Sequence, residues 1–181
     1  ALPIPAAPPA KTSSARFTGA TRKALQKADA AAARALAPGG AGATLETVET
    51  IPGIDSWPTQ SRPNVTPDGA SPLVTGMCLG AVHVMGKGVG EGMQVSVATT
   101  DFPNLALLVT AWVRKGLGNF PFSSIQINHN YAAARHVDGN NIGPSYIISL
   151  GDHTGGKLAV DDTYVEDKSE EAEAEAEAAA A

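Results

Sequence analysis

The sequence contains a single cysteine, Cys78, so no disulfide can form within the chain. A lone thiol in the apolar stretch "VTGMCLGAVHVM" is typical of a small core residue and suits a reducing compartment. No apolar run is long enough to cross a bilayer. The start "ALPIPAAPPA" lacks the basic and continuous apolar regions of a secretory signal. These absences predict an intracellular protein without a membrane segment.

Aromatic residues are scarce, at 5% of the chain, and all but Phe17 lie between Trp57 and Tyr164. We therefore expect order to begin near Pro72 and three regions to follow one another. Residues 1–71 read as a low-complexity linker region with an alanine-rich helix at about 18–37, which should dock weakly or not at all. Residues 72–162 should hold the folded core. Residues 163–181 form an acidic Ala/Glu tail, expected to be disordered or an exposed helix.

Charge is unevenly distributed along the chain. The net charge is −5, but residues 1–160 carry 12 basic and 9 acidic side chains, whereas residues 161–181 carry 1 basic and 9 acidic. A near-neutral body gives no strong electrostatic footprint for nucleic acid. The stretch 11–34 is an exception, with six basic residues against Asp29 alone. It fits either contacts with the phosphates of DNA or RNA or, more simply, a solvated helix face. The basic residues are Lys11, Arg16, Arg22, Lys23, Lys27 and Arg34.

Short alternating segments dominate the expected core. Strands are predicted for 77–85, "MQVSVATT", "FSSIQINHNY", "SYIISLGD" and "GKLAV". The glycines of "GKGVGEG" resemble part of a nucleotide-binding pattern, but a strand and not a helix follows them, which favours a hairpin loop. One helix is predicted in "TTDFPNLALLVTAWVRKGLG", capped by Asp101 or Thr100 and ended by Gly116. The fold class is therefore mainly β with supporting α-helices, as in a β-sandwich or jelly roll.

His136 and Asp138 form the pair with the clearest chemical meaning. On an extended chain, residues two apart point to the same side, roughly 6.5–7 Å from each other. An imidazole and a carboxylate placed in this way can converge on Fe(II), Mn(II) or Zn(II). The same spacing also occurs as an ordinary surface His–Asp pair, so the motif alone leaves both readings open.

The surrounding motifs resemble a known family. "MCLGAVHV", "WVRKGLGNF", "SIQINHNY", "HVDGNN", "GPSYIISLGD" and "GGKL" occur in this order. Together they resemble the iron(II)- and 2-oxoglutarate-dependent dioxygenases, and within them the TET/JBP-like branch. The resemblance covers about residues 72–162. It implies a double-stranded β-helix (jelly roll), with Fe(II) as the metal and 2-oxoglutarate as the co-substrate.

The resemblance also implies roles for individual residues. His136 and Asp138 would be two of the three iron ligands and the catalytic centre. Asn128 and Tyr131 lie where related enzymes place contacts to 2-oxoglutarate, although Tyr131 can equally be a packing residue and Asn128 can satisfy a strand edge. Asn140, Asn141 and Ser145 could face the substrate or stabilise a turn. In the related branch the substrate is a modified base in nucleic acid, which is compatible with a nuclear location.

Two features of the family have no counterpart in the final part of the sequence. The third iron ligand is a His beyond the "GGKL" strand, and an Arg or Lys beyond it pairs with 2-oxoglutarate. After Asp162 the sequence has no His, and Lys168 is its one basic residue. We therefore expect a partial β-helix that lacks its distal strands. As an enzyme, the chain should be incomplete or inactive. The alternatives are a non-catalytic binding module on the same scaffold and a plain structural domain. The sequence sets no oligomeric state.

Overall fold

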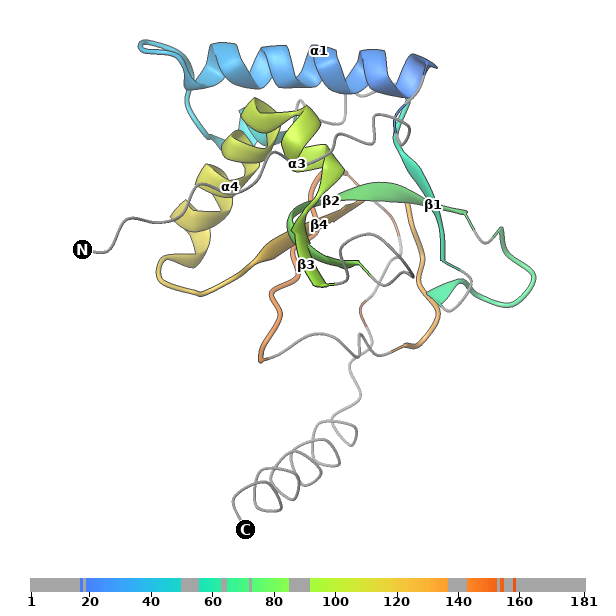
Figure 1. Cartoon of the computed structure of the whole chain (residues 1–181). Coiled ribbons are helices and arrows are strands. Elements are labelled where there is room, and N and C mark those ends of the chain that lie inside the picture. Colours follow the sequence, from blue (N-terminus) through green and yellow to red (C-terminus); the bar gives the residue numbers. More distant parts are fainter. Residues whose placement is uncertain are drawn as a thin grey trace. The chain divides into compact units, whose positions relative to one another are not determined.

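The computed structural model describes Phe17 and residues 19–49, 56–62, 65–71, 73–84, 92–136, 143–152, 154 and 158. The chain divides into two compact units, residues 1–148 and 149–181. The helices and strands that the structure describes lie in the first unit (Figure 1). In the second unit, the described residues form no helix or strand. Among the described residues, no helix has the length and apolar character needed to span a bilayer.

Among the described residues, the sheet has four antiparallel strands, and the longest of them, β2 (Leu73–Val84), pairs with the other three. The first part of β2 pairs with β1 (Thr59–Ser61), and its last part pairs with β3 (Gly92–Val95). Its middle pairs with β4 (Ser124–Asn128). Since Val84 is paired with Gly92, β2 and β3 form the hairpin expected for the glycine-rich stretch, most of which lies outside the described residues.

Two glycines let β4 approach the middle of β2. A Cβ at Gly76 would meet the carbonyl oxygen of Ile127, and a Cβ at Gly80 would meet that of Ser123. Gly80 also has φ +92°, a conformation that L side chains rarely adopt. Glycine within a strand commonly marks such close backbone contact. The β2–β4 pairing therefore depends on positions without side chains.

The helix α4 (Pro103–Leu117) packs its apolar face into the core. Leu105, Leu108 and Val109 are buried and join one cluster with Met77 and Leu79 of β2. This confirms the helix that the spacing predicts. Its end is later than expected, because the chain stays helical through Leu117 and reverses at Gly118, where φ is +57°.

The start of α4 differs from the expected capping. Asp101 and Thr100 belong to a short helix, α3 (Val97–Asp101), whose N-terminus is capped by Ser96 Oγ accepting from Thr99 N at 3.2 Å. This cap also ends the predicted strand "MQVSVATT" at Val95. The N-cap of α4 is Phe102, whose side chain makes no capping hydrogen bond.

A side chain from another helix supplies the missing cap. Asp29 of α1 (Gly19–Leu36) accepts a hydrogen bond from the backbone N–H of Leu105 at 2.8 Å and one from Asn104 Nδ2 at 2.9 Å. Leu105 is the third residue of α4, so the carboxylate lies on the positive end of the helix dipole. An acidic residue distant in sequence therefore does the work of a local N-cap.

Helix α1 is thus part of the core. Leu25 is fully buried, Ala32 is 2% exposed, and Arg22 forms an ion pair with Asp101 at 3.0 Å. In Figure 1, α4 lies between α1 and the strands. The helix prediction for 18–37 is confirmed, whereas the expectation of weak docking is wrong. The cause is one leucine and two charged side chains whose partners are more than 70 residues away along the chain.

The described strands form a small antiparallel sheet with helices packed on it. A jelly roll is not among the arrangements that these residues display, so that prediction remains untested. Elements upstream of the expected boundary at residue 72 join the same unit, since β1 pairs with β2 and Val65 is fully buried. A second short helix, α2 (Leu45–Glu49), also precedes that boundary and buries Val48.

The predicted strand "SYIISLGD" is wrong for this structure. Residues 144–150 have no strand assignment, and the side chains of Tyr146, Ile147 and Ile148 are 61–68% exposed. The ring of Tyr146 contacts that of Phe120 edge-on at 5.7 Å. The sequence pattern is that of a buried strand, but no described strand pairs with it. Most of "GKLAV" lies outside the described residues.

Candidate functional site

The candidate site residues cluster in the chain that leaves β4. Isoleucines 125 and 127 are half-buried on one side of this strand, and Ser124, Gln126 and Asn128 are exposed on the other. This confirms the alternation expected for "FSSIQINHNY". Gln126 Nε2 donates to Asn128 Oδ1 at 3.1 Å. The side chain of Asn128 therefore belongs to the exposed polar face.

Two contacts of His129 hold the start of the segment that follows β4. The N–H of His129 donates to the carbonyl of Thr75 at 2.9 Å, and the His129 ring stacks on Trp57 with centroids 4.9 Å apart and planes 8° from parallel. Asn130 has φ +46°, which asparagine tolerates better than most residues. The chain then bends and continues toward Tyr131 and His136.

Val65 is the second anchor of this segment. Its carbonyl oxygen accepts from Tyr131 Oη at 2.7 Å and from the N–H of Ala134 at 2.9 Å. Val65 is fully buried, so its carbonyl is a fixed point in the fold. The hydroxyl of Tyr131 is engaged with the backbone, which matches the packing alternative for this residue. Its assignment to 2-oxoglutarate remains untested.

His136 lies on the surface, two residues beyond Ala134. Its Nδ1 is 2.7 Å from the carbonyl oxygen of Ala134. Because a carbonyl oxygen only accepts hydrogen bonds, Nδ1 must be the protonated nitrogen. In the neutral ring this leaves the lone pair on Nε2. A backbone carbonyl that accepts from one ring nitrogen is the usual support for a histidine that coordinates a metal through the other.

The remaining predicted residues are only partly described. Asp138, Asn140 and Asn141 lie outside the described residues, so the structure does not test whether Asp138 converges with His136. Ser145 is exposed. Among the residues that can be described, no group of three or more His, Cys, Asp or Glu side chains is arranged to hold a metal ion.

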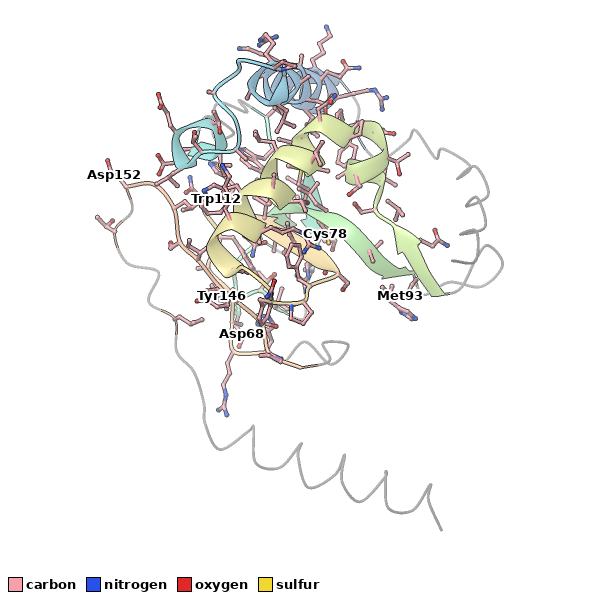
Figure 2. All side chains as sticks on the ribbon, turned by 90° about the vertical axis from the view of Figure 1, so that its left-hand side faces the viewer. Asp68, Cys78, Met93, Trp112, Tyr146 and Asp152 are labelled. Carbon is pink, nitrogen blue, oxygen red and sulfur yellow. The ribbon has the colours of Figure 1, made fainter. Side chains whose placement is uncertain are left out.

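His83 and Cys78 contribute little to such a site. His83 is exposed on β2, opposite Met93 of β3, and His153 lies outside the described residues. Cys78 is half-buried, and burial raises the pKa of its thiol, opposed by the charge of Arg62 and a hydrogen bond from Ser124. A thiol with a raised pKa stays protonated at neutral pH and is a poor nucleophile or metal ligand. Figure 2 marks Cys78 and Met93 on the strands.

Sequence reasoning missed the residues that support the site. Trp57 and Val65 fall in a stretch rich in Gly, Pro, Ser and Thr, which reads as a loop. Both are buried, and they hold His129, Tyr131 and Ala134. A tryptophan inside a supposed linker was the available signal, because large aromatic side chains usually need a packed environment.

The chain has no significant match in comparisons with protein-family models, curated proteins or solved structures.

Proposed function

We propose that this chain is a divalent-metal-binding domain of the Fe(II)/2-oxoglutarate dioxygenase type, incomplete in its ligand set, with His136 and Asp138 as two metal ligands. One observation carries the proposal. The hydrogen bond between His136 Nδ1 and the Ala134 carbonyl supports Nε2 as the nitrogen that would coordinate the metal. The resemblance of the flanking motifs supplies the choice of metal and co-substrate.

The donor chemistry fits a hard or borderline divalent cation. A neutral imidazole together with a carboxylate two residues later suits Fe(II) or Mn(II) better than a soft metal. Bound Fe(II) with 2-oxoglutarate supplies oxidative hydroxylation of a substrate, by resemblance a modified base in nucleic acid. The imidazole and the carboxylate support metal binding, and two ligands alone define no catalytic step.

The residues of this chain have definite tasks in the proposal. His136 coordinates through Nε2, and the Ala134 carbonyl holds its ring in the required tautomer. Tyr131 fixes the segment on Val65, and His129 fixes it on Trp57. These contacts limit the movement of the backbone that carries His136, which reduces the entropy lost when a metal binds.

Metal titration tests the proposal. Mn(II) is titrated into the full chain and followed by the loss of the free-ion electron paramagnetic resonance signal, with and without 2-oxoglutarate. We expect His136→Ala and Asp138→Ala each to weaken Mn(II) binding at least about tenfold. His83→Ala is the matched control, because it removes an exposed imidazole from β2. Tighter binding in the presence of 2-oxoglutarate would support the co-substrate assignment.

Two results would sink the metal site. One is equal Mn(II) affinity of the parent chain and His136→Ala. The other is an equal loss in His83→Ala, which would mean that the metal binds histidines without regard to place. Circular dichroism spectra and thermal unfolding of each variant separate a lost ligand from a lost fold.

A non-catalytic binding module is the second candidate function. The observation that favours it is the exposed apolar run of Tyr146, Ile147 and Ile148, which lies next to the candidate site in sequence. Contiguous exposed apolar side chains are typical of interaction surfaces. Cooperative unfolding together with no Mn(II) binding at millimolar concentration would favour this function over the first.

A further inference from the structure

We infer that the outer face of helix α1 binds the phosphate backbone of nucleic acid without sequence preference. The inference is independent of the metal site. It starts from the rotation of α1 about its axis, which the core fixes. Leu25 and Ala32 are buried, and Asp29 reaches the start of α4. The opposite side of the helix must therefore face solvent.

Three basic residues share that outer side. At 3.6 residues per turn, Lys23, Lys27 and Arg34 fall within an arc of about 40°, and Leu25 and Ala32 lie about 160–180° from its centre. All three basic side chains are exposed. With a rise of 1.5 Å per residue, they form a row of roughly 16 Å along the helix. In Figure 2, side chains with nitrogen at their tips project outward from α1.

No negative charge of α1 lies in this row. Asp29, the one acidic residue of the helix, is bound to Asn104 and Leu105 on the inner side. Arg22, which lies toward that side as well, is paired with Asp101. Among the described residues, the ion pairs do not include Lys23, Lys27 or Arg34. The charge of the outer row is therefore not neutralised by the helix that carries it.

The neighbours of the row distinguish between kinds of anionic partner. Ala30 and Ala31 lie between Lys27 and Arg34 and are exposed. Small side chains there let a phosphate backbone approach the helix closely. Helices that bind membrane surfaces carry large apolar residues beside their basic ones, and the exposed residues of this helix include none. A row of cations without an apolar partner face fits nucleic acid better than a lipid surface.

Salt-dependent binding measures the number of phosphates that the row neutralises. Fluorescence anisotropy with a labelled 20-base-pair DNA duplex is recorded for the full chain between 25 and 150 mM salt, with EDTA present so that no metal contributes. For duplex DNA, the logarithm of the binding constant falls linearly with the logarithm of the salt concentration, with a slope of about −0.9 for each phosphate contact. Replacing Lys23, Lys27 and Arg34 together by Gln should make this slope shallower by roughly 2.7.

The matched control replaces Lys87, Lys157 and Lys168 by Gln, which removes the same charge from outside α1. We expect this control to keep the parent slope. An unchanged slope in the α1 variant, or an equal change in the control, overturns the inference. So does a chain that binds phosphatidylserine vesicles but not the duplex, or that binds neither. Gln is a good helix former, so thermal unfolding of the α1 variant should be unaltered. Because the assay contains EDTA, its result is separate from that of the Mn(II) titration.

Discussion

Two regions of this molecule are held in place by different means. The first comprises β2, β4 and the helices on them, where buried apolar side chains and close backbone contact fix the arrangement. The second is the segment from His129 to His136, which is held by one ring stack and by hydrogen bonds to two carbonyl groups. The first region should respond to substitution through stability. The second should respond mainly through the position of His136.

The largest effect is expected at the β2–β4 contact. Gly80→Ala would place a Cβ against the Ser123 carbonyl at a φ that alanine rarely adopts. Backbone strain and overpacking together should lower the free energy of unfolding by about 4 kcal/mol. Gly116→Ala is the control, since nothing lies within 4 Å of its added Cβ, and it should be neutral or stabilising by up to about 1 kcal/mol.

Chemical denaturation by urea measures both glycine variants. Equal stability of Gly80→Ala and the parent chain would mean that β4 does not approach β2 as closely as described. Close backbone contact would then not be what fixes the first region.

The second effect concerns the docking of α1. Leu25→Ala removes the fully buried side chain of this helix and should lower the free energy of unfolding by about 3 kcal/mol. The control is Leu107 of α4, whose side chain is 58% exposed. Leu107→Ala should change the free energy of unfolding by less than about 0.5 kcal/mol. The same urea titrations check this pair. A neutral Leu25→Ala would restore the expectation that α1 docks weakly.

The third effect concerns the cap that α1 supplies to α4. Asp29→Ala leaves the N–H of Leu105 and the amide of Asn104 without their acceptor. Loss of an N-cap and of its charge on the helix dipole should lower the free energy of unfolding by about 1–2 kcal/mol. Asp68→Ala, at an exposed carboxylate in a turn, serves as the control.

The two regions also differ in how far the sequence predicts them. Periodic apolar residues predict α4 and β4, because the apolar positions recur about every 3.6 residues in a helix and every 2 residues in a strand that buries one face. The alanine-rich pattern gives α1 but not its docking, since Asp29 and Arg22 find partners that no local pattern records. The sequence likewise locates His136 but not its support. Val65 acts through its carbonyl oxygen, which every residue possesses, so no side-chain pattern marks it.

At the apolar run around Tyr146, the sequence predicts a strand that these residues do not form. Its composition is that of a buried strand, and period and propensity both favour one. A strand forms only where another strand or edge accepts its hydrogen bonds, and no described strand pairs with residues 144–150. Local preference was sufficient to predict a strand but could not provide the neighbour that the strand requires.

The smallest expected effect on stability is also the most informative about the second region. Tyr131→Phe removes the hydroxyl that donates to Val65 and keeps the ring. The carbonyl of Val65 still accepts from Ala134, so the free energy of unfolding should fall by only about 1 kcal/mol. The Mn(II) affinity should fall more than this loss of stability suggests, severalfold at a temperature where the chain remains folded, because His136 is then held at one point fewer. Tyr146→Phe is the control, since its ring contact with Phe120 needs no hydroxyl. If both variants bind Mn(II) as the parent does while His136→Ala does not, the metal site does not depend on the Tyr131 hydroxyl, and the remaining contacts of His129 and Ala134 are sufficient to order the segment.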